Sequence, residues 1–186
     1  MRVLNILFGA VVVAWPFVLH ALLGRVGLPW IAGLLAAMAV VRAVLARTRL
    51  WSAIALVTCG LAAIAALAGQ ALPLKLYPVL VNAALLTVFG FSLVHPPTAI
   101  ERLARLTDPA LSPEAVRYTR RVTQVWCGFF LLNGGLAAAT ALWASDAVWT
   151  LYNGLVAYLL IGLLFAGEWL VRRRVMARDR AAAGSP

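Results

Sequence analysis

Charge, cysteine and histidine are all scarce in this chain, and their scarcity excludes several classes of protein. Only 12% of the 186 residues are charged, whereas about 25% is usual in a soluble domain. Cys59 and Cys127 lie in no Cys-x-x-Cys motif and have no histidine nearby, which favours small apolar side chains over metal ligands or redox thiols. His20 and His95 fall near opposite membrane faces, about 30 Å apart, so they cannot share a metal. We therefore predict no metal, no cofactor and no catalytic residue.

The chain is unusually rich in apolar residues. They make up 64% of the chain, against roughly 45–50% in soluble proteins, which indicates a polytopic membrane protein. A length of 186 residues leaves room for five or six helices of about 20 residues with their turns, but not for a separate soluble domain. Any function is therefore expected in the helix bundle, its short loops or its tails.

Charged residues divide the apolar sequence into six predicted spans. The uncharged runs between Arg2 and Arg25 and between Arg49 and Lys75, for example, are long enough to cross a bilayer. The expected fold is an all-α bundle of six transmembrane helices in one domain, residues 1–171, followed by a basic, disordered tail at residues 172–186. The helices are expected near residues 3–23, 27–46, 50–71, 75–94, 118–143 and 147–171.

Lysine and arginine are unevenly divided between the two sides of this bundle. Nearly all of the 16 basic residues fall in the N-terminus, the second and fourth loops and the C-terminal tail. The positive-inside rule then predicts that both termini are cytoplasmic, and we expect a multi-pass protein of a bacterial inner membrane. Contact with anionic lipid explains the formal net charge of +10, and nucleic-acid binding is not expected.

Charge is concentrated in one stretch, VHPPTAIERLARLTDPALSPEAVRYTRR, which we name the elbow (residues 94–121). The two prolines of its HPP sequence end the fourth helix, and Thr98 followed by Glu101 predicts a capping box. A short helix is expected at 98–107, with apolar and charged residues on opposite arcs, which is typical of a helix lying in the membrane interface. Ser112 and Pro113 predict an N-cap and a new helix that continues into the fifth span.

Three interpretations of the elbow are open: a well-capped connection at the membrane surface, a docking surface for a cytoplasmic partner, or a catalytic loop. The spacing of its histidine and carboxylates matches no known acid/base or phosphate-binding arrangement. The candidate contacts to partner proteins or lipid head groups are the arginines of the elbow and tail, namely Arg102, Arg105, Arg117, Arg120, Arg121, Arg172, Arg173 and Arg174.

Polar residues inside the spans form a second set of candidates. At 1.5 Å per residue, Asn82, Asn133 and Asn153 all fall roughly 10–15 Å below the same membrane surface, so they could meet. They fit either interhelical hydrogen bonding or a substrate site. Glu168 is the only carboxylate that falls inside a span, and it could pair with Arg172 or act as a proton or ligand site.

The second half of the chain resembles a known family. Lys75 precedes a span that ends at HPP, and the elbow contains AIERLARL. The last helices carry a pattern of five aromatic residues and one glycine, namely Trp126, Phe129, Phe130, Gly134, Trp143 and Trp149. From Lys75 to about Leu170, the sequence is similar to the intracellular septation protein A (YciB-type) family of inner-membrane proteins. The layout of the chain and the run KLYPVLVNAALLTVFGFSL are also similar to small membrane proteins associated with aryl-polyene and acyl-carrier-protein pathways.

Both resemblances imply an inner-membrane accessory role in building the cell envelope, and neither implies an active site. The first function that we expect is that of a scaffold without catalytic activity in envelope biogenesis or division, recruiting partners through the elbow and tail. The alternative is a transporter or membrane enzyme that handles a lipid-linked acyl or polyene product. The sequence leaves the choice open.

Overall fold

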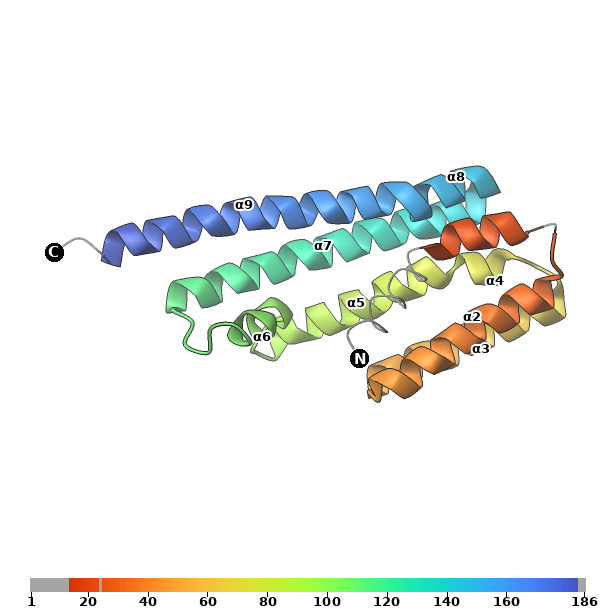
Figure 1. Ribbon diagram of the computed structural model, residues 1–186, viewed down its shortest axis with the longest axis horizontal. Helices are drawn as coiled ribbons and strands as arrows, with labels where there is room; N and C mark the ends of the chain where they lie inside the picture. Colours follow the sequence, from red (N-terminus) through yellow and green to blue (C-terminus); the bar gives the residue numbers. More distant parts are fainter. Residues whose placement is uncertain (1–13, 24, 184–186) are drawn as a thin grey trace.

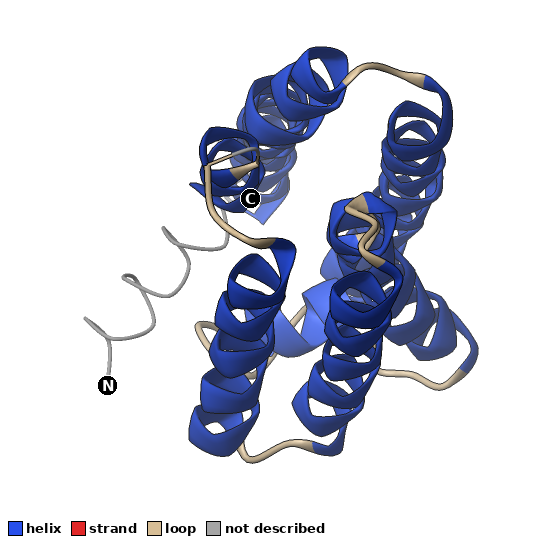
Figure 2. Ribbon diagram, turned by 90° about the vertical axis from the view of Figure 1, so that its right-hand side faces the viewer, coloured by secondary structure: helices blue, strands red, loops and turns tan. Residues whose placement is uncertain are grey.

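The computed structural model describes residues 14–23 and 25–183, with side chains as far as Arg172, as helices joined by short loops (Figures 1 and 2). Within these residues there is no strand, and the all-α prediction is confirmed. A π-helical segment, η1 (Tyr152–Val156), joins α8 to α9. Residues 14–22 are helical and are followed by α2 (Leu28–Ala46), α3 (Arg49–Ala68), α4 (Leu72–Lys75), α5 (Tyr77–Val94), α6 (Ala99–Arg105), α7 (Pro113–Trp143), α8 (Asp146–Leu151) and α9 (Ala157–Ala183).

Five helical segments are long and apolar enough to cross a membrane, and the chain is a multi-pass membrane protein. They correspond to the second through sixth predicted spans. Residues 3–13 of the first predicted span lie outside the described residues, so the count of six stays a prediction. The five segments are Leu28–Ala46, Arg49–Ala68, Leu72–Val94, Pro113–Trp143 and Asp146–Arg172.

Local sequence explains the hairpin formed by α2 and α3. Arg47 adopts the left-handed conformation (φ 50°) and ends α2. Thr48 then caps α3, because its hydroxyl accepts a 3.4 Å hydrogen bond from the Trp51 backbone N–H. Gly69 ends α3 at φ 64°, a conformation that glycine adopts without steric cost. The two helices therefore lie side by side with a tight turn between them (Figure 1).

The two longest helices, α7 and α9, exceed what a bilayer requires. Ser112 caps α7 and Pro113 occupies its first turn, as the sequence predicted. The 31 residues of α7 extend about 46 Å, beyond the roughly 30 Å of a hydrocarbon core. The backbone of α9 is helical as far as Ala183, so residues 172–183 of the tail that was expected to be disordered are helical, and residues 184–186 lie outside the described residues. Alanine, arginine and methionine in this segment are strong helix formers.

Large buried side chains form two clusters. The first gathers at the end of the bundle that holds α4 and α8, and its largest fully buried members are Trp15, Leu19, Ile31, Leu35, Leu74 and Trp149. The second lies along α7, where Val122, Trp126 and Phe130 pack against residues of α5 and α9. Members of both clusters line a pocket between them, whose walls are therefore held by two packed regions.

Candidate functional site

A pair of asparagines joins α5 to α7. The Asn133 Nδ2 donates a 3.1 Å hydrogen bond to the Oδ1 of Asn82, and both side chains are buried. Gly134 lies beside this pair, and a Cβ placed there would be 3.0 Å from the Cβ of Asn82. The absence of a side chain at position 134 therefore lets the two helices approach closely enough for these short amides to meet.

The π-helical segment η1 brings two more polar side chains to α7. The Tyr152 hydroxyl donates a 2.9 Å hydrogen bond to the Oδ1 of Asn133. The Asn153 Nδ2 donates to the Oγ1 of Thr140 at 3.2 Å and to the carbonyl of Trp149 at 3.0 Å. A π segment inserts an extra residue into a helix and is frequent at functional sites. Here it directs two consecutive side chains toward the same neighbouring helix.

The three predicted asparagines therefore meet only in part. Asn82 and Asn133 bond to each other, whereas Asn153 bonds to a threonine of α7 and to its own helix. All three are buried, and all three line a single pocket. The role of Tyr152 and the π segment was not predicted from the sequence. The local feature that could have indicated the π segment is the glycine in YNG, because glycine weakens a regular α-helix.

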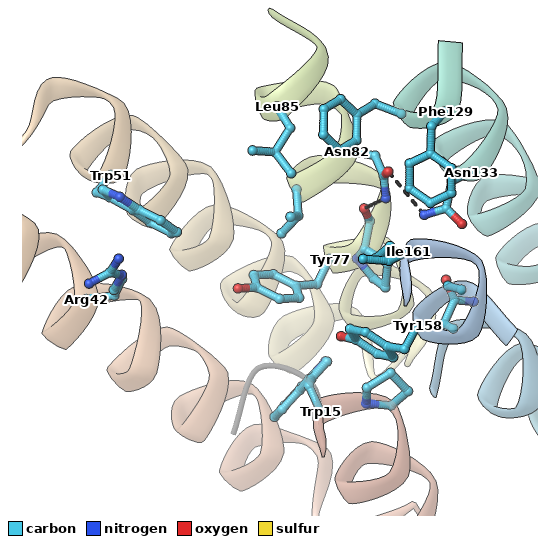
Figure 3. Close-up of a pocket in the computed structure, with 16 residues that line it drawn as sticks. Trp15, Arg42, Trp51, Tyr77, Asn82, Leu85, Phe129, Asn133, Tyr158 and Ile161 are labelled. Carbon is cyan, nitrogen blue, oxygen red and sulfur yellow. Dashed lines mark hydrogen bonds between the residues drawn. The ribbon is translucent and has the colours of Figure 1, made fainter. Parts of the chain in front are cut away.

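We name this space of about 340 Å³ the central pocket (Figure 3). It lies between the α2–α3 hairpin and the group formed by α5, α7 and α9. Arg42 and Trp51 face it from the hairpin, and the asparagine pair lies on the opposite side. The remaining lining consists mainly of rings and aliphatic side chains: Trp15, Pro16, Tyr77, Pro78, Val81, Leu85, Phe129, Phe130, Ala157, Tyr158 and Ile161.

The central pocket combines apolar walls with a few fixed polar groups. The guanidinium carbon of Arg42 lies 4.5 Å from the ring centroid of Trp51, a cation–π contact that positions the charge at the edge of the pocket. Tyr77 and Tyr158 add two phenol groups between this cation and the asparagines. Pockets that bind small molecules typically hold roughly 300–1,000 Å³ and have this mixture of apolar lining and few polar groups.

An ion pair joins two spans at the end of the bundle opposite the elbow. Lys75, the last residue of α4, pairs with Asp146, the first residue of α8. The lysine side chain is 12% exposed and the aspartate 51%. Trp149 Nε1 also donates a 3.2 Å hydrogen bond to the Lys75 carbonyl. The sequence does not predict this pair by itself, although the predicted topology puts these opposite charges at one membrane face.

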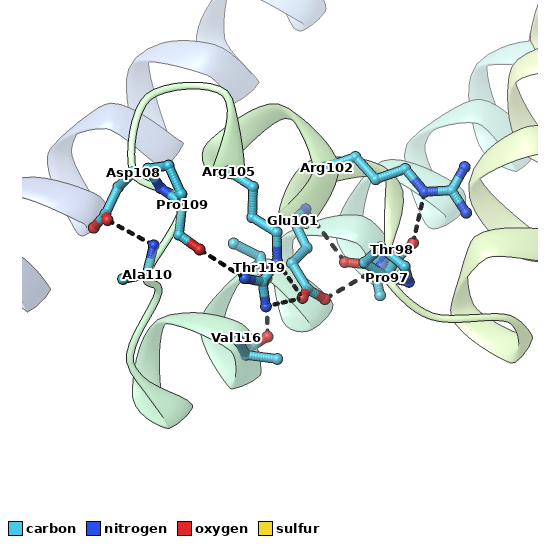
Figure 4. Close-up of polar contacts among 10 residues, drawn as sticks. All are labelled: Pro97, Thr98, Glu101, Arg102, Arg105, Asp108, Pro109, Ala110, Val116 and Thr119. Atoms are coloured by element: carbon cyan, nitrogen blue, oxygen red, sulfur yellow. Dashed lines mark hydrogen bonds and ion pairs between the residues drawn. The ribbon is translucent and has the colours of Figure 1, made fainter.

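The elbow is held by a network around Glu101 (Figure 4). The capping box is confirmed, since the Thr98 Oγ1 accepts from the Glu101 N–H at 3.4 Å and the Glu101 Oε2 accepts from the Thr98 N–H at 3.3 Å. Arg105 donates to the other carboxylate oxygen at 3.0 and 2.7 Å, and to the carbonyl of Pro109 at 3.0 Å. Helix periodicity put Glu101 among the charged residues opposite the apolar arc of this helix, yet its side chain is only 5% exposed, because hydrogen bonds from Thr98 and Arg105 satisfy its carboxylate.

Other elbow arginines also bond within the chain. Arg102 Nε donates to the carbonyl of Pro97 at 2.9 Å, and Arg120 Nη1 donates to the carbonyl of Leu93 at 2.9 Å. These two arginines satisfy carbonyls at the end of α5 and in the proline turn, where prolines remove backbone donors. Arg117 forms only an exposed pair with a nearby glutamate. Arg102, Arg105 and Arg120 thus stabilise the connection between α5 and α7.

A second space, which we name the elbow pocket, has a volume of about 530 Å³ and lies between α6, α7 and α9. It includes Glu168 and Arg172 of α9. The Tyr118 hydroxyl donates to the carbonyl of Glu168 at 3.2 Å and lies 3.5 Å from its Oε1. Among the described side chains Glu168 forms no ion pair, so the expected pairing with Arg172 is not formed. Arg121 is exposed, and the side chains of Arg173 and Arg174 lie outside the described residues.

Comparison with models of protein families finds no match to this chain, and comparisons with curated proteins and with solved structures find none either. The fold and the site define a class on their own: an all-helical, multi-pass membrane protein. Within that class, its distinctive features are a central pocket lined by buried amides and aromatic rings and a charged elbow pocket.

Proposed function

We propose that the protein binds an amphipathic acyl- or polyene-type molecule in the central pocket and transports or presents it within the membrane. One observation supports this proposal best: buried amides from α5, α7 and η1 converge on one pocket with two phenols, the buried Tyr77 of α5 and the half-buried Tyr158 of α9. Polar groups are costly inside a membrane, and those that face a cavity commonly belong to a substrate or ion path. Interhelical packing alone would not require a pocket beside them.

The pocket suggests how such a molecule would be held. Its hydrocarbon part would lie against the aromatic and aliphatic walls, and Arg42 would attract a carboxylate or phosphate at its polar end. An asparagine amide carries two N–H donors. The Asn82 Nδ2 makes one described bond, to the Pro78 carbonyl, and the Asn133 Nδ2 makes one, to Asn82. Each amide therefore retains a donor for a ligand.

The lining favours binding over catalysis. Among the described residues that line the pocket, the polar groups are amides, phenols, indoles and one guanidinium, without a carboxylate or histidine. Such groups bind and orient a molecule, but they are poor proton-transfer groups near neutral pH. The proposed setting is a bacterial inner membrane with both termini in the cytoplasm, because basic residues concentrate in the loops and tails on that side. The resemblance to proteins of aryl-polyene and septation pathways favours envelope assembly as the process served.

The proposal is tested with alanine at Asn82, Asn133 and Asn153 in cells that carry the protein as their only copy. We expect the amphipathic product in membrane extracts to fall several-fold while the abundance of the protein stays constant. The matched control is Thr87→Ala, since this exposed threonine lies on α5 and its hydroxyl bonds only within that helix. Normal product levels in the triple variant would contradict the proposal.

A second candidate function is a scaffold that recruits partners through the elbow. The observation in its favour is that the elbow exposes Leu103 of α6 and Leu106, the residue that follows α6, at 59% and 82%, and also exposes Arg117 and Arg121 at the start of α7. Reversing these two arginines to glutamate is a better test than altering Arg105, which holds the elbow together. Loss of crosslinking to partner proteins with normal membrane insertion supports the scaffold, and unchanged crosslinking excludes it.

A further inference from the structure

The elbow pocket differs from the central pocket in carrying charges of both signs. It is formed where α6 and the start of α7 lie against α9, and Trp126 and Phe165 supply aromatic rings to its wall. Asp108, Glu168 and Arg172 also line it. At about 530 Å³, it is larger than the central pocket and within the size range of ligand sites.

These charges are not neutralised by one another. Glu168 receives one long contact of 3.5 Å from the Tyr118 hydroxyl, and Asp108 accepts one backbone hydrogen bond of 3.1 Å. Neither carboxylate, nor Arg172, takes part in an ion pair among the described side chains. Glu168 and Arg172 are four residues apart on α9, about 6 Å along the helix axis. The pocket therefore presents an anionic and a cationic group side by side, each available to a ligand of opposite charge.

The apolar side of the pocket continues onto an exposed surface. Leu103 of α6 lines the pocket and is 59% exposed, and Phe165 of α9 lines it and is 57% exposed. Trp126, in contrast, is only 6% exposed and forms the inner part of the wall. In a membrane protein, exposed apolar side chains next to a charged pocket are suited to acyl chains that lead away from a bound head group.

We infer that the elbow pocket binds a zwitterionic phospholipid whose head group carries a primary amine, of the phosphatidylethanolamine type. The ammonium group would lie against Glu168 and Asp108, and the phosphate against Arg172. A purely anionic head group would bring its phosphate and any second anion close to two carboxylates, which is repulsive. A choline head group has the same charges but no N–H to donate to the carboxylates. The acyl chains would follow the surface of Phe165 and Leu103.

Competition between lipids tests this inference on the intact protein. The purified chain in detergent is mixed with equal amounts of phosphatidylethanolamine, phosphatidylcholine and phosphatidylglycerol of identical acyl chains, and native mass spectrometry measures the retained lipid. We expect phosphatidylethanolamine to be retained several-fold over the other two. Glu168→Gln should reduce this preference to near one, and Arg172→Gln should lower retention of all three. Glu114→Gln is the control, because Glu114 pairs with Arg117 at the exposed start of α7 and does not line the pocket.

Lipid retention by the unaltered protein is enough to overturn the inference. Equal retention of the ethanolamine and choline lipids by the unaltered chain would exclude recognition of the amine, and preferential retention of phosphatidylglycerol would indicate contact with arginine alone. Soluble phosphoethanolamine at equal concentration should not displace the lipid, because it lacks the acyl chains that contact the apolar wall; full displacement would also overturn the inference. Asn82→Leu should leave the lipid preference unchanged, so this test is independent of the central pocket.

Discussion

The side-chain amide of Asn133 on α7 donates a 3.1 Å hydrogen bond to that of Asn82 on α5, at a point where Gly134 leaves room for only a hydrogen between the helices. The same two amides line the central pocket. One contact therefore serves both to pack α5 against α7 and to present polar groups to a ligand. Measurements of stability and of ligand binding in variants of these residues separate the two roles.

A double-mutant cycle measures the packing role. We expect Asn82→Leu and Asn133→Leu each to lower the free energy of unfolding in detergent, because each removes the shared hydrogen bond and leaves one buried polar atom of the partner amide, the Nδ2 of Asn133 or the Oδ1 of Asn82, without it. The double variant should lose less than the sum, with a coupling of about 0.6 kcal/mol, the average for such bonds in membrane proteins. Strict additivity would mean that the two amides do not interact.

Two adjacent glycines provide a matched comparison for the close approach of α5 and α7. Gly134→Ala should lower the free energy of unfolding by about 1–3 kcal/mol, because its Cβ would meet the Cβ of Asn82 at 3.0 Å. Gly135→Ala should be neutral or stabilising by up to about 1 kcal/mol, since nothing lies within 4 Å of its Cβ and alanine favours helix. Thermal unfolding measures both variants, and equal effects of the two changes on stability would contradict the described packing.

The Lys75–Asp146 ion pair should contribute a modest stability. Lys75→Met is expected to lower the free energy of unfolding by about 1 kcal/mol or less, because Asp146 is half exposed and can be hydrated when its partner is lost. Arg117→Met is the control, since both members of its ion pair are more than half exposed, and its effect should be smaller. If the two variants unfold at the same midpoint, the pair does not join the spans as described.

The capping box should stabilise α6 against local unfolding. Thr98→Ala is expected to destabilise α6 by about 1 kcal/mol and to speed amide hydrogen exchange across Ala99–Arg105 several-fold. Thr107→Ala, a change just beyond the helix at an exposed threonine, should leave exchange unchanged. Identical exchange rates in both variants would show that the box is not what holds the elbow.

Features that depend on local sequence could be predicted well. The ends of the spans follow from charges, prolines and capping residues, and the caps at Thr98 and Ser112 are formed as predicted. The shared depth of Asn82 and Asn133 also followed from a constant rise per residue along each span. These predictions succeed because some depend only on residues close together in the chain. The others depend on the bilayer, which aligns all spans roughly along one direction and so makes depth predictable from residue number.

Features that depend on how the spans rotate and pack were not predictable. Nothing in the order of residues shows that Arg42 and Trp51 face the central pocket, or that a π segment turns Tyr152 toward Asn133. The elbow arginines were expected to face solvent or lipid, whereas Arg102, Arg105 and Arg120 bond to carbonyls near prolines or to Glu101. Hydrophobic periodicity sets a helix face but leaves the choice of neighbour to packing.

The most direct test of the central pocket is photochemical labelling with a long-chain fatty acid that carries a diazirine in mid-chain. After irradiation of the purified protein, peptide mapping should find the label on Tyr77–Leu85, Phe129–Asn133 and residues 157–161. Excess unlabelled fatty acid should suppress this label, and Asn82→Leu should reduce it several-fold. Label confined to outward-facing residues such as Leu67 and Leu163, and unaffected by competitor or variant, would contradict binding in the central pocket.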